Sequence, residues 1–244
     1  MKKVSKYILL IIVFLPLLYF RDFTPNNELK YLSIADEALR SGTYLTFTHE
    51  GSIYTDKPPL YLWLIMLCKQ LLGHHSMLLL GLFSFIPALL ILYVMEKWLS
   101  PYIPSNYLFT FSLMLITTGL FAGSAIVLRM DMLMSLFILL ALYTFYRMYT
   151  GQAGKGAKVL LPLYIFLALF TKGPLGLIIP FFSILVFLLY QKEGKTFFSY
   201  FGLLQWFILV GLCSVWFLGV YWEGGSNYLY NLVFHQTLDR AMDS

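Results

Sequence analysis

Seven apolar runs divide the sequence, and each is long enough to cross, or nearly cross, about 30 Å of hydrocarbon. They occupy residues 7–20, 76–95, 105–122, 125–146, 158–171, 174–190 and 203–221. Three runs are close to or below the usual minimum of about 17 residues, so they need tilting, flanking residues or local bilayer thinning. The pattern predicts an all-α, multi-spanning transmembrane helical bundle with about seven spans.

The longest polar segment, residues 21–75, falls between the first two runs. Residues 27–41 carry apolar side chains at helical spacing, with Asn27 as an expected N-cap and Gly42 as a stop. This pattern predicts an amphipathic helix at the membrane surface. A second helix is expected to begin at the double proline, Pro58 and Pro59, and to end near Gly73. We therefore treat residues 1–244 as a single transmembrane domain with one long loop and its surface helices at 21–75.

Composition supports the membrane assignment. The chain is 59% hydrophobic and 12% charged, against about 25% charged residues in soluble domains, and its mean hydropathy is +0.75. One globule of this size could not bury so much apolar surface, so lipid must cover the rest. The formal charge of +5 is scattered between apolar runs, and nucleic acid is not an expected partner. Cys68 and Cys213 lie in apolar runs and form no metal or redox pattern.

The distribution of basic residues predicts the orientation. A cytoplasmic amino terminus also leaves residues 96–104, 147–158 and 191–202 inside. The inside set has two acids, Glu96 and Glu193, and these bases: Lys2, Lys3, Lys6, Lys97, Arg147, Lys155, Lys158, Lys192 and Lys195. The outside set has the other eight of the 17 bases and ten of the 12 acids. Short basic cytoplasmic loops follow the positive-inside rule.

The amino-terminal run could be mistaken for a signal peptide, because three lysines precede it. Small residues should mark a cleavage site. That place is instead occupied by bulky side chains: Leu17, Leu18, Tyr19 and Phe20. We interpret the run as a retained anchor of a multi-pass membrane protein.

Polar residues from distant parts of the sequence collect on the external face: Asn26, Asn27, Glu28, His49, Glu50, Asp56, Lys57, Arg129, Asp131, Lys172, Glu223, His235 and Asp239. Charges beside a span are costly to bury, so Arg129, Asp131 and Lys172 are expected to face a wet cavity or one another. The simpler alternative is that these charges only mark the ends of the spans in the headgroup region.

Asp56 and Lys57 are the strongest candidates because the prolines that follow hold them on a stiff turn. A fixed lysine suits a phosphate, and a neighbouring carboxylate suits a divalent cation. The alternative is a helix start with an incidental ion pair.

No Walker sequence, Gly-rich dinucleotide loop, HExxH or nucleophile elbow occurs. A donor of a transferred group is therefore expected to arrive through the membrane, as a lipid-linked phosphate.

Four stretches of the sequence resemble one family. They are NNELKYLSIADEALRSGTYLTFTHEGSIYTDKPPLYLWL, VLRMDMLMSLF, TKGPLGLIIP and YLYNLVFHQTLDR. They resemble the first external loop, the start of the fourth span, the TKG turn and a later external loop of the polyprenyl-phosphate-sugar-dependent membrane glycosyltransferases. This family, in the C-type glycosyltransferase superfamily, includes protein O-mannosyltransferases and the lipid A aminoarabinose transferase. Together the stretches extend over nearly the whole chain.

The resemblance implies transfer of a sugar from a polyprenyl phosphate to an acceptor lipid, glycan or protein on the external, periplasmic face of the cytoplasmic (inner) membrane. It also implies an acidic pair in the first loop, the first acid being the base. Here the pair reads Asn27 and Glu28, and an amide cannot accept that proton. The catalytic candidates are thus Glu28 and Asp131, with Asp56 as a further alternative for the base.

The remaining implied roles concern the donor and a metal. The resemblance implies that Lys57 contacts the donor phosphate, with Arg129 and Lys172 as helpers. It implies a divalent metal ion at Asp56, with His235 as a distant partner. Family members are about twice as long as this chain, so we expect a part of a larger transferase. The alternatives are a partner-dependent, non-catalytic membrane subunit and a transporter, but a transporter would place polar groups near the bilayer midplane.

Overall fold

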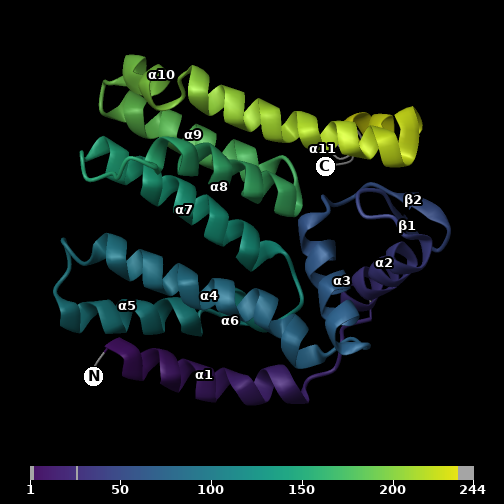
Figure 1. The fold of residues 1–244 in the computed structure, drawn as a ribbon. Coiled ribbons are helices and arrows are strands. Elements are labelled where there is room, and N and C mark those ends of the chain that lie inside the picture. Colours follow the sequence, from purple (N-terminus) through teal and green to yellow (C-terminus); the bar gives the residue numbers. More distant parts are fainter. Residues whose placement is uncertain (1–2, 26, 236–244) are drawn as a thin grey trace.

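The computed structural model describes residues 3–25 and 27–235, apart from the side chains of residues 3–5 and 235. Most of the described chain is helical, and the apolar helices lie side by side in a bundle (Figure 1). In chain order the elements are α1 (Lys3–Phe20), α2 (Glu28–Ser41), β1 (Phe47–His49), β2 (Ser52–Tyr54), α3 (Leu60–Leu72), α4 (Met77–Leu99), α5 (Ser105–Thr117), α6 (Gly119–Ile126), α7 (Asp131–Tyr149), α8 (Ala157–Lys172), α9 (Leu175–Tyr190), η1 (Gly194–Thr196), α10 (Phe197–Tyr200), α11 (Leu203–Tyr230) and η2 (Asn231–His235).

Every predicted apolar run forms helix. By length and composition, however, fewer than seven of the described helices could each cross a membrane. Three described helices are long and apolar enough to cross a membrane: Met77–Leu99, Asp131–Tyr149 and Leu203–Phe234. A fourth is added if α5 and α6 are counted as one broken span. The multi-helix membrane fold is therefore confirmed and the number seven is not.

The third predicted run is not one straight helix. The chain bends by 70° between α5 and α6, where Thr118 has an extended backbone (φ −62°, ψ 124°). The hydroxyls of Thr117 and Thr118 donate to carbonyl oxygens four residues earlier, those of Leu113 (2.7 Å) and Met114 (2.9 Å). Such back-bonding favours bends in helices. The fourth run was also predicted to begin too early, because α7 starts only at Asp131.

The two predicted loop helices are confirmed as α2 and α3. Gly42 and Gly73 end them with positive φ values of 71° and 74°, a conformation that glycine adopts without steric cost. Asn27 occupies the N-cap position of α2, but its side chain makes no capping hydrogen bond and its backbone is already helical. The capping role predicted for Asn27 is therefore wrong.

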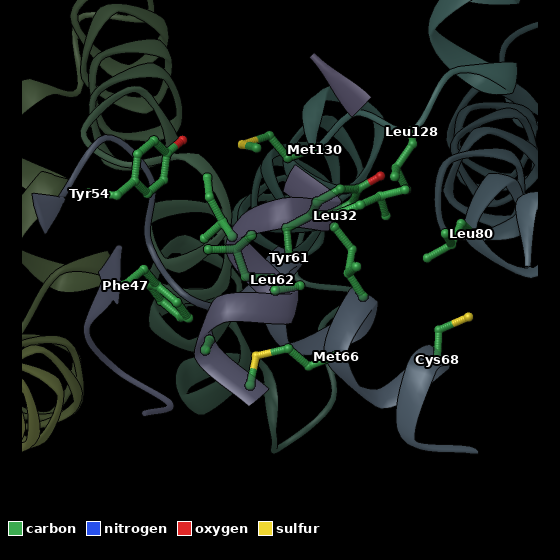
Figure 2. Close-up of a cluster of buried hydrophobic side chains, with 14 residues drawn as sticks. Leu32, Phe47, Tyr54, Tyr61, Leu62, Met66, Cys68, Leu80, Leu128 and Met130 are labelled. Carbon is green, nitrogen blue, oxygen red and sulfur yellow. The ribbon is translucent and has the colours of Figure 1, made fainter. Parts of the chain in front are cut away.

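An antiparallel hairpin between α2 and α3 was not predicted. Phe47 pairs with Tyr54 and His49 with Ser52. Glu50 and Gly51 form the connection with φ values of 54° and 76°, as a two-residue type I′ turn requires. The hairpin, α2 and α3 share a buried core with the start of α4 and the segment before α7. Figure 2 shows this core, which includes Tyr61, Leu128 and Met130.

Helix α1 is packed into the bundle. Leu10, Phe14 and Leu18 are buried, and α1 packs against α4 and α6. Near the amino terminus the Lys6 ammonium forms a buried ion pair with the Glu96 carboxylate, which also accepts hydrogen bonds from Ser112 and Tyr7. Without α1, the Glu96 carboxylate would be left buried and unpaired, at a large energetic cost. The packing favours the prediction of a retained anchor.

The loops gather at two opposite ends of the bundle. The amino terminus and the connections at 100–104, 150–156 and 191–202 lie at one end in Figure 1. Helices α2 and α3 and the hairpin lie at the other end, which we call the cap end. This grouping agrees with the sequence prediction that successive loops lie at alternate ends of the helices. The cytoplasmic location of the amino terminus stays a prediction.

Candidate functional site

Five charged residues predicted from the sequence lie at the cap end, and we call them the charged cluster: Asp56, Lys57, Arg129, Asp131 and Lys172. The Asp131 carboxylate pairs with the Lys172 ammonium through Oδ1 and with Arg129 through Oδ2, where Nε is 3.4 Å away. Lys57 Nζ lies 2.9 Å from Asp56 Oδ1. The expectation that Arg129, Asp131 and Lys172 face one another is met.

Local structure explains how Asp131 and Lys172 meet. Asp131 is the first residue of α7, and Lys172 is the last residue of its neighbour α8. Acids are favoured at helix amino termini and bases at carboxyl termini, because of the helix dipole. Gly173 then turns the chain with φ 97°. A Cβ atom on Gly176 would lie 2.2 Å from the Ala168 carbonyl carbon, so only glycine allows α9 to pack so closely on α8.

Lys57 is the most enclosed cation of the charged cluster, with its side chain 10% exposed. Burial, together with the nearby positive charges of Lys172 and Lys30, lowers its pKa to about 8 against the opposing effect of Asp131. Lys57 is therefore held close to other cations in a confined place. An anion with several oxygens would relieve this repulsion, and a phosphate is such an anion.

Glu28 lies apart from the charged cluster and is fully buried. Its two oxygens accept hydrogen bonds from Arg21 (2.9 and 2.5 Å), from the Thr24 backbone and hydroxyl (2.6 and 3.0 Å) and from the Leu128 backbone N–H (2.5 Å). Burial raises the pKa of this carboxyl group, but these hydrogen bonds outweigh burial and lower it overall. Glu28 thus joins the loop at 21–75 to the segment that carries Arg129 and Asp131.

Of the two residues predicted to hold a metal, Asp56 and His235, the structure describes the side chain of Asp56 only. Asp56 is paired with Lys57. No group of three or more His, Cys, Asp or Glu side chains suited to a metal occurs among the described residues. The side chain of His235 lies outside the described residues, as do Asn26 and Asp239. The divalent metal stays a prediction, and no chemical step is assigned to it.

A groove of about 550 Å³ opens beside the charged cluster. It lies between α4, the bent pair α5–α6 and α7. Its wall is mainly apolar and includes Ile91, Leu115, Phe121 and Leu139, whereas Arg129 and Asp131 stand at its polar end. The bend at Thr118, which also lines the groove, separates α5 from α6 at this point. The groove therefore combines a surface for hydrocarbon with a charged end.

Sequence reasoning missed three residues around the site. Lys30 adds a cation and lies with Nζ 5.0 Å from the centre of the Tyr54 ring. Tyr228 accepts a hydrogen bond from Phe47 N (3.0 Å) and donates one to Tyr54 O (2.7 Å). Glu223, which was grouped with the external polar residues but given no role, accepts from the backbone N–H groups of residues 44–46. Helical spacing could have flagged Lys30, but no sequence signal joins α11 to the hairpin.

Comparison with solved structures shows which fold this is. ArnT from Cupriavidus metallidurans, in a crystal structure bound to undecaprenyl phosphate, superposes with a TM-score of 0.83 over 96% of this chain, at 18% identity. The apo structure of the same protein gives a TM-score of 0.83 at 19% identity over 95% of the chain. The chain has the ArnT fold. The resemblance to polyprenyl-phosphate-sugar-dependent membrane glycosyltransferases is thereby confirmed at the level of fold.

Sequence relatives agree with the ArnT fold. An uncharacterized protein from Aquifex aeolicus (strain VF5) is 29% identical over 230 residues, which are 88% of this chain and 44% of that protein. Undecaprenyl phosphate-alpha-4-amino-4-deoxy-L-arabinose arabinosyl transferase 2 from Sodalis glossinidius (strain morsitans) is 26% identical over 194 residues, or 75% of this chain and 34% of the relative. No family model matches the sequence. This chain spans less than half the length of these relatives and of ArnT, of which it covers 43% to 44%.

Proposed function

We propose that this chain is the donor-binding part of an inverting glycosyltransferase. It would move a sugar from a polyprenyl phosphate to an acceptor on the non-cytoplasmic face of the membrane. The observation that carries the proposal is the charged cluster beside an apolar groove, in which Lys172 and Arg129 pair with Asp131 and Lys57 pairs with Asp56. The ArnT fold and the Sodalis relative support transferase activity in general.

Lys57 would bind the phosphate of the donor. It is the most enclosed cation of the cluster, and neighbouring positive charges make an anionic ligand favourable there. Arg129, half-exposed at the polar end of the groove, would supply a second contact while the isoprenoid chain lies along the apolar wall. The ligand in the ArnT crystal structure, undecaprenyl phosphate, has this combination of an anion and a long hydrocarbon chain.

Asp131 would act as the base. Its side chain is 30% exposed and its partners are the long side chains of Lys172 and Arg129, so an acceptor hydroxyl can reach the carboxylate at the cap end. The hydroxyl oxygen would bond to the anomeric carbon while its proton passes to Asp131. The bond from that carbon to the phosphate oxygen breaks, and polyprenyl phosphate leaves. Glu28 would instead hold the loop, because five donors already occupy its oxygens.

Replacement of Lys57 by Ala tests the donor site. Loss of a charge-assisted contact is expected to weaken binding of undecaprenyl phosphate to the purified chain by about tenfold or more. Transfer from a polyprenyl-phosphate sugar in proteoliposomes should fall with it. Lys69→Ala is the matched control, because Lys69 also lies at the cap end but pairs with Asp36, outside the charged cluster.

Three outcomes separate the alternatives. Weaker binding in Lys57→Ala but not in Lys69→Ala supports the donor site. Unchanged binding and unchanged transfer in Lys57→Ala would contradict it. Transfer that appears only when a membrane extract is added to the proteoliposomes would favour the partner-dependent subunit over an enzyme active by itself.

A further inference from the structure

A second cavity lies at the opposite end of the bundle from the charged cluster. It has a volume of about 260 Å³ and lies between the last turns of α7, the connection at 150–156 and the first turn of α8. Its wall includes Leu140, Tyr143, Arg147, Gly154, Gly156 and Tyr164. Sixteen positions of α7 separate Arg147 from Asp131, which corresponds to roughly 24 Å along a helix. The two sites are therefore independent.

Arg147 is held in place but keeps donors available. Its Nη2 donates to the Gln152 carbonyl oxygen at 2.7 Å, and its guanidinium carbon lies 6.0 Å from the centre of the Tyr143 ring. An arginine has five N–H donors. No carboxylate among the described residues forms an ion pair with Arg147. The guanidinium is thus oriented in the cavity wall without a neutralising partner.

The surroundings of this cavity are positively charged. Lys155 and Lys158 are exposed next to it, and the sequence has no Asp or Glu between Asp131 and Glu193. Gly154 and Gly156 leave the backbone uncovered, and a Cβ atom at either position would meet no other atom within 4 Å. The charge of the wall and its small size suit a compact anion.

The rest of the wall is suited to lipid. Leu140 and two tyrosines line the cavity, and Val159 and Leu160 are 46% and 39% exposed beside it. Tyrosine is favoured at membrane interfaces, where its ring meets both hydrocarbon and water. Basic pockets between membrane helices bind anionic lipid headgroups. We propose that this cavity binds the phosphate headgroup of an anionic phospholipid from the leaflet next to residues 147–158.

Lipid titration of the purified chain in detergent tests this proposal. Phosphatidylglycerol should raise the midpoint of thermal unfolding in a saturable manner, and phosphatidylcholine should not. Arg147→Gln should weaken the apparent affinity for phosphatidylglycerol by about tenfold. Lys192→Gln, in another loop at the same end of the bundle, should change that affinity by less than about twofold. Equal effects of the two lipids, or an unchanged affinity in Arg147→Gln, would overturn the proposal.

Two further arms complete the test. Glycerophosphoglycerol, which is deacylated phosphatidylglycerol, has the same phosphodiester without acyl chains, and binding as tight as that of phosphatidylglycerol would overturn the assignment to lipid. The double variant Lys155→Gln/Lys158→Gln changes exposed side chains only, so it keeps the test open if Arg147→Gln does not fold. We expect a loss of affinity of about fivefold to tenfold, because bases beside a headgroup attract an anionic lipid and salt screens part of that attraction. Wild-type affinity in the double variant would contradict the proposal.

Discussion

Glu28 and Asp131 are both acids at the first position of a helix at the cap end, yet their surroundings differ. Glu28 is fully buried, and hydrogen bonds from Arg21, Thr24 and Leu128 occupy its oxygens. Asp131 is 30% exposed and contacts two cationic side chains. A carboxylate whose oxygens are all engaged by buried donors stabilises structure, whereas a partly exposed carboxylate can be reached by a substrate. The comparison separates a structural acid from a candidate catalytic acid.

The largest expected effect is on Asp131. Asp131→Asn keeps the shape of the side chain but removes its ability to accept a proton. We expect transfer from a polyprenyl-phosphate sugar in proteoliposomes to fall by about 100-fold or more, the usual contribution of a general base. The midpoint of thermal unfolding should change little, because partly exposed ion pairs contribute about 1 kcal/mol or less. Retained transfer would remove Asp131 from the proposed mechanism.

The converse is expected for Glu28. Glu28→Gln leaves the Arg21 charge without its carboxylate, and breaking a buried pair costs about 3 kcal/mol or more. We expect a clearly lower midpoint of chemical unfolding in detergent, while the transfer rate per folded molecule falls by less than in Asp131→Asn. A variant with wild-type stability and no transfer would return Glu28 to the role of base.

The two regions should also respond to different pH ranges. Lys57 has a pKa of about 8 in the fold, so binding of undecaprenyl phosphate should weaken as the pH rises through 8. Lys57→Arg should bind with little change over that range, because arginine stays charged. The folded pKa of Lys57 lies below the unfolded one. Its contribution to the free energy of unfolding therefore rises with pH, while donor binding weakens.

Glu28 should respond in acid. Its folded pKa lies below its usual value of 4.5, so its stabilising contribution is present above that pH and is lost as the pH falls through the folded pKa. Unfolding measured from pH 6 downwards should show this loss in the wild-type chain and in Asp131→Asn. Glu28→Gln should show a smaller loss, because Asp36 and Glu37, whose pKa values are also lowered, still contribute. A loss of the same size in that variant would assign the acid response to these other groups.

The smallest expected effect concerns Thr24. Its hydroxyl donates to Glu28 at 3.0 Å, so Thr24→Ala should lower the free energy of unfolding by about 1 kcal/mol. Thr24→Ser is the matched control, because it keeps the hydroxyl and should lose less. If the two variants are equally destabilised, the hydroxyl does not contribute to the contacts of Glu28.

Local signals predicted the loop helices well. The glycines that end α2 and α3 act through their own backbone conformation, and the double proline marks the start of α3. The bend at Thr118 was not predicted, because apolar residues continue across it and hydropathy does not record backbone direction. The hairpin turn at Glu50 and Gly51 is a two-residue signal that could have been recognised.

The site was predicted in its parts and not in its contacts. The stiff turn at the double proline singled out Lys57, and span ends singled out Arg129, Asp131 and Lys172. The sealed surroundings of Glu28 could not be foreseen, because one of its donors, the Leu128 N–H, lies 100 residues away in the sequence. Contacts of that range depend on how α2 packs on the segment before α7, which residue spacing does not encode.

The ion pair between Lys6 and Glu96 has a consequence for biogenesis. Its two partners are 90 residues apart, so during synthesis α1 enters the membrane long before α4 exists. Until then the Lys6 ammonium must stay at the aqueous boundary, where it helps to fix the direction of insertion. The buried ion pair can form only after α4 has been synthesised. The orientation of α1 is therefore set before its packing against α4 is complete.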